Sequence, residues 1–392
     1  MPHIHIDSLG DFRPPLRHGK VFFEWMASNI RHPEEKLIRC DVDGIGFFLQ
    51  VKPRGEGVLV KAEKITRPSP NTLIKYALQA IVERVAPRVF YSNIADPDRD
   101  RLKAPHPCLK EITSFARGEL PDGEIWVEVG FGSGRHLLHQ ARSHPDVHLI
   151  GLEIHRPSLE QVMRLVELER LDNVWLVDYD ARLFMELLPS NSLARIFVHF
   201  PVPWDKKPHR RVISDDFVKE ALRVLEPDGT LELRTDSENY FRYATEVFTR
   251  PKRCRVTIEK NAPAVVRSKY EDRWLRLEKN IYELHTRALE ASPPREAVGG
   301  FDFDSGADFE RLVRHLPQKA LVKEGYFVHF ERLYRIDDRS GVLRLSFGSF
   351  DRPEHKYILF DRDSARYFPS EPVPTRTNNQ AHRAIKEWLC PA

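Results

Sequence analysis

The sequence predicts an α/β protein in which a doubly wound parallel sheet is flanked by smaller α+β and β-rich domains. Residues 106–290 alternate short apolar runs with amphipathic stretches, whereas residues 36–65 and 325–375 alternate as hairpin strands around turns containing glycine. A polar, proline-containing stretch at 288–300 resembles a linker. We therefore expect three domains, at residues 1–105, 106–290 and 300–392.

The central segment passes repeatedly from strand to helix. Its connections are short, which favours a parallel sheet with helices on both faces. We expect strands at 125–129, 148–154, 174–177, 194–200 and 230–234, and helices at 134–143, 157–170 and 214–225.

Both flanks pass from hairpins to a helix, at 71–86 in the first flank and at 380–389 in the last. In each, a turn containing proline and threonine precedes the helix. This similarity leaves two alternatives open, an internal duplication or two unrelated extensions that share a turn composition.

Composition indicates the compartment and limits the partners. The 392 residues carry a formal net charge of +3, so a polyanionic partner has to meet local basic patches. The four cysteines are far apart, which argues against a disulfide framework or a metal site and fits a reducing cytosol. The first residues, MPHIHIDSLGDF, lack the basic and apolar regions of a signal peptide, and no apolar run approaches membrane length. We expect a soluble, cytoplasmic protein without a bound metal.

A glycine loop follows the first central strand. Gly130, Gly132 and Gly134 alternate after Glu128 and open a helix, in the spacing G-x-G-x-G. Glycine permits close approach of a cofactor to the backbone, and the spacing differs from the dinucleotide pattern G-x-G-x-x-G. A carboxylate at the strand tip repels a diphosphate and favours a nucleoside with a cationic tail. S-adenosylmethionine, with an ammonium and a sulfonium, fits this description.

Acidic residues also follow the next two strands. Glu153 lies about twenty residues beyond the glycine loop, where a carboxylate accepts hydrogen bonds from ribose hydroxyls. Asp178 and Asp180 follow the third strand, where an acid would hold the adenine amino group. Each acid alone would be an ordinary surface carboxylate, but acids at three successive strand ends predict a cofactor site.

The fourth strand ends in the sequence HFPVPWDKKPHRR, a proline-stiffened loop rich in positive charge. Its cations lie beside the predicted cofactor crevice and could neutralise phosphates of a folded RNA. The alternative is a solvated charged loop, and Trp204 could either stack on a base or anchor the loop. The candidate phosphate contacts are Lys206, Lys207, His209, Arg210 and Arg211.

The segments VEVGFGSG, GLEIHRPS, DYDARLF and FPVPWDKKPHRR together resemble the bacterial tRNA (guanine-N7)-methyltransferases. That family carries F-P-D-P-W-H-K-K-R-H after the fourth strand, followed by T-D-x-x-x-Y and T-K-F-E-x-R elements. The last two correspond here to residues 235–240 and 268–273. The resemblance covers about residues 106–285 and implies a class I, Rossmann-like methyltransferase core. Both flanks lie outside it.

The resemblance implies transfer of a methyl group from S-adenosylmethionine to N7 of a guanosine in tRNA, at variable-loop position 46. It places Lys206 near phosphate or base and Asp236 near the target guanine, with the 268–271 stretch closing over it. Asp236 or Glu271 would accept hydrogen bonds from guanine N1–H and N2–H2, or would instead pair with Arg273 or cap a helix. The stretch contains Ser268, Lys269, Tyr270 and Glu271.

The chain departs from the family pattern at Val202, which replaces the aspartate between the two prolines. Either that acid is dispensable because N7 carries a free lone pair, or Asp205 takes over its placement role beside Lys206, or activity is reduced. The alternative functions are a methyltransferase for another RNA site or a small molecule, and a non-catalytic RNA-binding protein. Large extensions favour a monomer.

Overall fold

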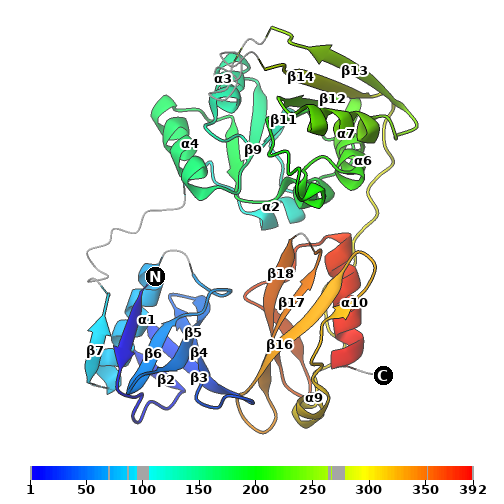
Figure 1. Ribbon diagram of the computed structural model, residues 1–392. Helices are drawn as coiled ribbons and strands as arrows, with labels where there is room; N and C mark the ends of the chain where they lie inside the picture. Colours follow the sequence, from blue (N-terminus) through cyan, green and yellow to red (C-terminus); the bar gives the residue numbers. More distant parts are fainter. Residues whose placement is uncertain are drawn as a thin grey trace. The chain divides into compact units, whose positions relative to one another are not determined.

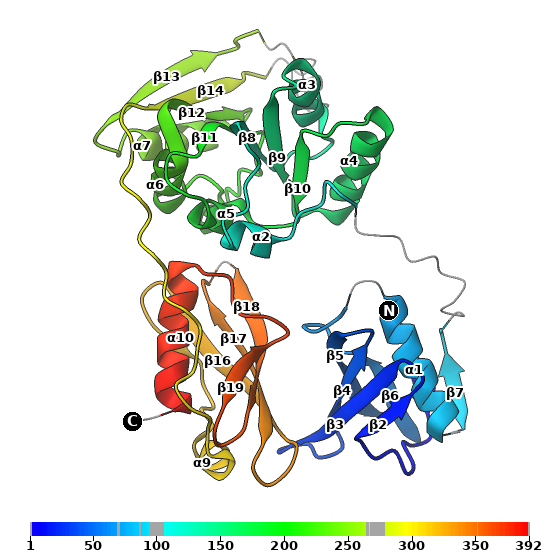
Figure 2. The same ribbon diagram turned by 180° about the vertical axis from the view of Figure 1, so that it is seen from behind.

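The computed structural model describes residues 2–68, 71–85, 88–94, 106–263, 266, 279–350 and 352–390 (Figures 1 and 2). The chain divides into two compact units, one formed by Pro105–Ala297 and the other by Met1–Ala104 together with Val298–Ala392. The two flanking segments therefore belong to one unit. Across the described residues, no helix has the length and apolar character needed to cross a membrane.

The described part of Pro105–Ala297 contains a seven-stranded sheet in the order β10-β9-β8-β11-β12-β14-β13. Strands β8 to β12 run parallel, and β14 runs antiparallel to both of its neighbours. The strand order reverses between β8 and β11, and ligands bind at the carboxyl edge of such a switch point. The strands are β8 (Glu124–Val129), β9 (Val147–Leu152), β10 (Val174–Val177), β11 (Leu193–His199), β12 (Leu225–Thr235), β13 (Cys254–Lys260) and β14 (Tyr282–Ala288).

Helices bury the parallel strands on both faces. Phe197 of β11 packs in one cluster with α3 and α4, while its neighbours Ile196 and Val198 are fully buried on the opposite face. Continuous apolar runs of this kind are typical of parallel strands covered on both sides. The helices are α2 (Ile112–Ala116), α3 (Arg135–Ser143), α4 (Arg156–Glu169), α5 (Ala181–Leu187), α6 (Asp215–Val224) and α7 (Glu238–Phe248).

The predicted doubly wound α/β core is confirmed, with differences at its far edge. Strand β12 begins at Leu225, earlier than the expected strand at 230–234, and its pairing with β11 shifts register between Leu193 and Arg195. The helices α2, α5 and α7 and the strands β13 and β14 were not predicted from the sequence. Most residues of β13 are exposed, so that strand lacks the apolar run on which the other predictions rested.

The second unit contains a twelve-stranded sheet among its described residues, in the order β19-β18-β17-β16-β3-β4-β5-β6-β1-β7, with β2 on β3 and β15 on β16. The pairing of β3 with β16 joins the two flanks, which the sequence analysis treated as separate domains. The strands are β1 (His3–Ile6), β2 (Leu16–His18), β3 (Val21–Asn29), β4 (Lys36–Val42), β5 (Ile45–Arg54), β6 (Gly57–Ala62), β7 (Val89–Ser92), β15 (Leu321–Val322), β16 (Phe327–Arg335), β17 (Gly341–Gly348), β18 (Pro353–Phe360) and β19 (Ala365–Phe368), and the helices are α1 (Thr72–Val85), α9 (Phe309–His315) and α10 (Arg376–Leu389).

The two flanks repeat one arrangement. In the first repeat, the antiparallel strands β3, β4, β5 and β6 lead to α1, and in the second, β16, β17, β18 and β19 lead to α10. Both helices have 14 residues. The first strand of each repeat has a bulge, at Glu24 between Phe23 and Trp25 in one and at Glu331 in the other. Matching bulges at a glutamate support the internal duplication rather than two unrelated extensions.

Equivalent arginines make the same local contact in each repeat. Arg39 pairs with the bulged Glu24, and Arg344 pairs with the bulged Glu331. Each arginine also reaches the other repeat: Arg39 lies over the Phe368 ring at 4.2 Å, and Arg344 Nη1 is 3.4 Å from Glu63 Oε1.

Aromatic residues fill the junction of the repeats. Phe48 pairs across the sheet with Arg39, Tyr357 pairs with Arg344, and the two rings meet edge to face with centroids 4.9 Å apart. Both belong to a shared buried cluster. The faces of the two repeats that lack a helix therefore pack against one another near the junction.

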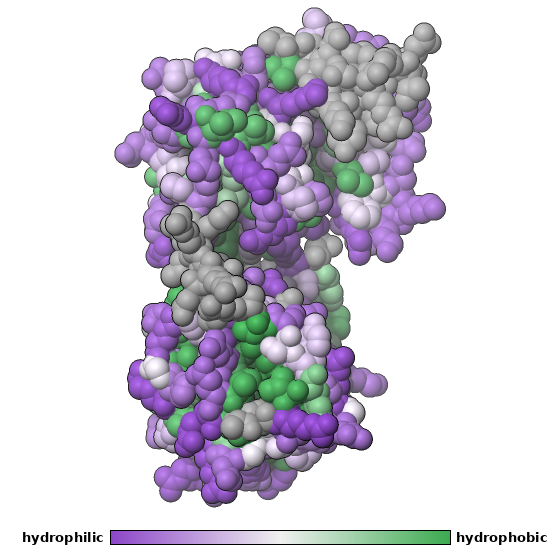
Figure 3. Space-filling view, turned by 90° about the vertical axis from the view of Figure 1, so that its left-hand side faces the viewer, coloured by the Kyte–Doolittle hydropathy of each residue, from purple (hydrophilic) through white to green (hydrophobic). Residues whose placement is uncertain are grey.

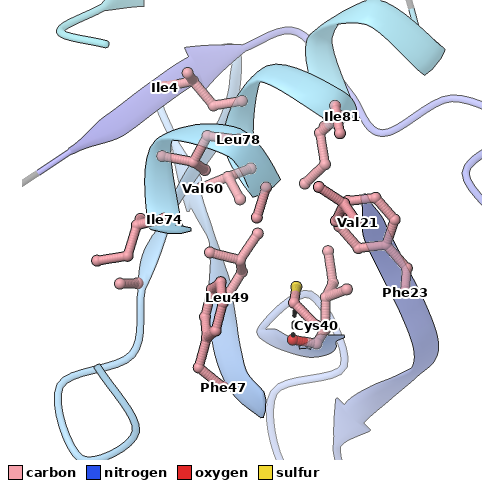
Figure 4. Close-up of a cluster of buried hydrophobic side chains, with 14 of the residues drawn as sticks. Ile4, Val21, Phe23, Cys40, Phe47, Leu49, Val60, Ile74, Leu78 and Ile81 are labelled. Carbon is pink, nitrogen blue, oxygen red and sulfur yellow. Dashed lines mark hydrogen bonds between the residues drawn. The ribbon is translucent and has the colours of Figure 1, made fainter. Parts of the chain in front are cut away.

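On its other face, each repeat has a core of its own beneath its helix. Figure 4 shows Ile74, Leu78 and Ile81 of α1 directed onto the strands, where they pack in one buried cluster. The thiol of Cys40 lies in this cluster, donates to the Ile38 carbonyl, and has a pKa raised above its usual range by burial. All four cysteines are free thiols.

Candidate active site

The glycine loop joins β8 to α3 at the switch point of the sheet. Gly130, Gly132 and Gly134 all have positive φ, at 68°, 53° and 74°. A Cβ at Gly134 would lie 2.5 Å from Val162 Cγ2, so this glycine is needed for close packing of α3 on α4. A Cβ at Gly130 would have no atom within 4 Å, so space lies open above the loop. A cofactor that approaches the backbone fits this cradle.

Glu153 lies at the rim of this cradle, directly after β9. Its Oε2 accepts a hydrogen bond from Gly132 N at 3.0 Å, and its Oε1 accepts from Ile154 N and His155 N at 2.8 Å each. Three backbone donors thus fix the carboxylate beside the glycine loop. A fixed carboxylate at the end of the second strand is suited to accept hydrogen bonds from a ribose.

Glu128, at the tip of β8, is almost completely buried and is held by a histidine that the sequence analysis missed. Its Oε2 lies 2.8 Å from His136 Nδ1 on α3. Burial by itself would lower the pKa of His136, but the charges of Glu128 and then Glu232 outweigh burial and raise that pKa. Any ammonium group that approaches Glu128 would share this carboxylate with the imidazole.

Further ionisable side chains lie beside His136. His199 Nε2, at the end of β11, is 2.8 Å from Glu232 Oε1, and His285 Nδ1 is 3.8 Å from Glu232 Oε2. Burial raises the pKa of Glu232, but the hydrogen bond from His199 and the neighbouring imidazoles reverse this and lower it to about 2. The sequence signal was the alternation of ionisable residues along β11 and β12, which places them on one face.

His136, His199 and Glu232 line a cavity of about 320 Å³. The wall contains histidine, arginine and glutamate side chains, so the cavity suits a polar guest rather than an apolar one. Its lining consists of His136, His139, Gln140, His144, Arg195, Phe197, His199, Glu232, Arg234, Pro263, Val266 and Glu283.

The loop after β11 contains two residues with rare backbone angles. Phe200 and Trp204 have φ of 49° and 46°, which is unusual for bulky side chains and is found where the surrounding structure enforces it. The chain then forms a 3₁₀ turn at Pro208–Arg210. Trp204 is 37% exposed, and Arg210 lies over its ring at 5.2 Å. The tryptophan is thus partly accessible and partly covered by its own loop.

Arg211 lies inside the loop, unlike its neighbours. Its Nε donates to the Pro203 carbonyl at 2.7 Å, and its Nη2 is 3.3 Å from Asp205 Oδ1. The guanidinium also lies over the rings of Tyr240 and Tyr243 on α7. Because the side chain is only 7% exposed, we correct the sequence assignment of Arg211 as a phosphate contact. Lys206, Lys207, His209 and Arg210 are exposed.

Val202, at the position of the family's aspartate, is 60% exposed. The acid nearest to it in sequence, Asp205, has Arg211 as its ion-pair partner. The carboxylate of Asp205 is therefore used in holding the loop together.

The remaining candidates are placed as follows. Asp236 follows β12, and its Oδ2 is 3.1 Å from Lys279 Nζ. Asp180 caps α5 by accepting from Arg182 N at 3.0 Å and also pairs with the Arg182 guanidinium. Tyr240 is fully buried and its hydroxyl accepts from Ile213 N. Ser268, Lys269, Tyr270 and Glu271 lie outside the described residues.

Together, the strand order and the carboxyl edge define the class of protein. An acid ends β8, a second follows β9 and a third follows β10, and a glycine loop with open space above it lies among them. This arrangement is that of a class I, Rossmann-like methyltransferase.

Comparison with known proteins identifies the family. Residues 122–284 match the family described as "Putative methyltransferase". The chain is 45% identical to a tRNA (guanine-N(7)-)-methyltransferase of Wolinella succinogenes, over 99% of this chain and 100% of that protein. Proteins of the same name from Campylobacter fetus and Helicobacter pylori are 38% and 34% identical, over 99% and 96% of this chain and 99% and 93% of their own lengths. The chain belongs to the tRNA (guanine-N7)-methyltransferase family.

Proposed function

We propose that this protein transfers a methyl group from S-adenosylmethionine to N7 of a guanosine in tRNA, at variable-loop position 46. The observation that carries the proposal is the full-length similarity to proteins named for this activity. The fold agrees, because β8 and β11 are neighbours, so the glycine loop and the basic loop leave the same edge of the sheet. Donor and acceptor can therefore meet there.

The cofactor, when bound, supplies an electrophilic methyl group on a sulfonium. We assign the open cradle above Gly130 and Gly132 to its nucleoside, with Gly134 keeping the helix close behind. Glu153 is preset by its three N–H partners to accept from the ribose hydroxyls. We assign Asp180, after β10, to the adenine amino group.

Glu128 is assigned to the amino group of the methionine part of the cofactor. His136 engages its Oε2, and we assign its Oε1 to this contact. Because the carboxylate is buried, its charge acts at short range with little screening by water.

Guanine N7 has a free lone pair, so methyl transfer does not require a base to remove a proton. Orientation of the base is then the main requirement, and positioning of this kind can lower a barrier by roughly 7–11 kcal/mol at best. We infer that Asp205 acts by fixing the loop through Arg211, and that Val202 is tolerated because no proton acceptor is needed there. Lys206 is exposed beside them and is free to contact phosphate or base.

We assign recognition of the RNA backbone to Lys206, Lys207, His209 and Arg210, which are exposed on one loop. Phosphate contacts of this kind give affinity that does not depend on sequence and that falls steeply with salt. The paired Asp236 is assigned to the guanine edge, where N1–H and N2–H2 distinguish guanine from adenine.

The decisive experiment is methylation of unmodified tRNA with labelled methyl donor, followed by chemical cleavage at 7-methylguanosine. We expect one labelled site at position 46, and no label when guanosine 46 of the transcript is replaced by adenosine. Label at another position or on another atom would identify a different RNA methyltransferase. Absence of label from every tRNA tested would refute the proposal.

A further inference from the structure

The first repeat carries two additional strands at its outer edge. Beyond β6, the sheet continues into β1 and β7, which have no counterpart after β19 in the described part of the second repeat. Ile4 and Ile6 of β1 complete the core beneath α1. The alternate residues, His3 and His5, consequently face the opposite side of the sheet.

Aromatic and basic side chains gather on that side. His5 pairs with Leu59, and His3 pairs with Lys61 on the neighbouring strand β6. All residues of β7 are exposed, with Phe90 at 37% and Tyr91 at 53%. Tyr91 pairs with His5, and a register shift at Phe90 lets this adjacent ring lie against His5 on the same side. We call this surface the β1–β7 face and define it by His3, His5, Leu59, Lys61, Phe90 and Tyr91.

The rings of the β1–β7 face are held in place. His3 stacks on Tyr91 with centroids 5.4 Å apart at 29°, and the centroids of His5 and Phe90 are 4.9 Å apart. The Phe90 ring lies above Gly57, where a Cβ would come within 2.9 Å of it. Rings fixed in this way lose little conformational entropy when a flat partner stacks on them.

Basic residues surround these rings. The Arg88 guanidinium lies 5.3 Å from the Phe90 centroid, Arg54 is exposed at the end of β5, and Lys61 lies on the face itself. Among the described residues, the acids next to these cations in sequence or by hydrogen bond are Asp7, whose carboxylate accepts from the Arg88 backbone N–H, and Glu56 in the turn after β5. The described part of the chain thus places several cations around an aromatic surface.

The same face of the sheet is buried nearer the junction of the repeats. There Phe48 is fully buried in the cluster shared with the second repeat, whereas Phe90 and Tyr91 remain exposed. Figure 3 views the side of Figure 1 on which β7 is drawn and shows hydrophobic residues grouped among hydrophilic ones. Exposed aromatic rings within a basic rim are the features with which proteins bind single-stranded nucleic acid.

We propose that the β1–β7 face binds an unpaired segment of the tRNA substrate. Bases stack on Tyr91 and Phe90, while Arg54, Lys61 and Arg88 neutralise the adjoining phosphates. The proposal rests on the proposed function for the identity of the RNA. The first flank then helps to bind the substrate, while the reaction takes place at the glycine loop.

The test compares Tyr91→Ala and the double variant Phe90→Ala/Tyr91→Ala with wild type, using full-length unmodified tRNA. We expect the Kd for tRNA to rise at least about fivefold in the double variant, because each stacked base contributes substantially to affinity. The KM for tRNA should rise in parallel, while kcat at saturating tRNA and the affinity for S-adenosylmethionine stay within about twofold. Tyr91→Phe keeps the ring and should bind as wild type does.

Phe350→Ala is the matched control, because Phe350 is 54% exposed and stacks on Phe327 in the second repeat. It should leave tRNA binding unchanged. Unchanged tRNA binding by the double variant would overturn the proposal, as would an equal loss in Phe350→Ala. Loss of self-association instead of RNA binding would identify the face as a protein interface. Binding that depends on Tyr91, without methylation by wild type, would refute the proposed function but not this inference.

Discussion

Replacement of Arg211 by alanine tests whether the buried Arg211 side chain stabilises the basic loop. The variant loses the hydrogen bond to the Pro203 carbonyl, the contact with Asp205 and the two tyrosine rings beneath the guanidinium. A hydrogen bond from a charged group contributes about 1.5–3 kcal/mol. Asp205 is 52% exposed, so its ion pair adds less than about 1 kcal/mol. Cation–π contacts add about 0.5–2 kcal/mol.

Because these terms share one side chain and are not additive, we expect Arg211→Ala to lower the free energy of unfolding by about 2–4 kcal/mol. Denaturant unfolding measures this loss. The KM for tRNA should rise because the loop that carries Lys206 loses its fixed shape, whereas the affinity for S-adenosylmethionine should be retained.

Arg210→Ala is the matched control, since Arg210 is exposed and lies only over Trp204. We expect it to leave stability nearly unchanged and to reduce the slope of log K for tRNA against log salt by about one phosphate contact. The reasoning would be refuted if Arg211→Ala gave that change of slope without loss of stability, because Arg211 would then be a phosphate contact.

Three further variants test the site. Glu153→Ala should weaken S-adenosylmethionine binding at least about tenfold in calorimetry while tRNA affinity survives, and equal loss of both would contradict the ribose assignment. Val202→Asp should leave kcat within a few fold, and a very large gain would show that the native site lacks a needed acid. Glu232→Gln should remove up to about 3 kcal/mol of stability at neutral pH, because the pKa of Glu232 is about 2 in the fold against a usual 4.5. This stabilisation is present above pH 4.5 and is lost as pH falls toward 2, so acid titration of wild type but not of the variant should show it.

The parallel core could be predicted because each of its strands has a recognisable pattern in adjacent residues. The run from Ile196 to Val198 is apolar and β-branched or aromatic, and prolines follow shortly after it at 201 and 203, so both the type and the end of this strand can be recognised from adjacent residues. Once the end of a strand is located, an acid that follows it can be assigned to the carboxyl edge of the sheet, as Glu153 after β9 illustrates. By contrast, β13 and β14 carry charged and apolar residues in turn, so neither shows the continuous apolar run on which the other strand predictions rested.

Other features depend on contacts between different elements of the fold, which a local sequence pattern does not record. Arg210 and Arg211 are indistinguishable in a run of basic residues, and only the turn at 208–210 directs one outward and the other onto Tyr240. The partner of Glu128 is His136, across the glycine loop on the next helix, and nothing in a single strand records that contact. A contact of this kind can be identified only once the position of the helix on the sheet is known.

The junction of the two flanks is the clearest example of a contact between residues far apart in sequence. Glu35 and Arg332 are 297 positions apart, yet they form an ion pair at 3.1 Å beside the pairing of β3 with β16. Without the second repeat, the end of β3 at Ser28 and Asn29 would present an open edge and Phe48 would lose the cluster that buries it, and exposed edges of this kind favour aggregation. The second repeat therefore completes the fold of the first, and the two flanks are best treated as one folding unit interrupted by the methyltransferase core.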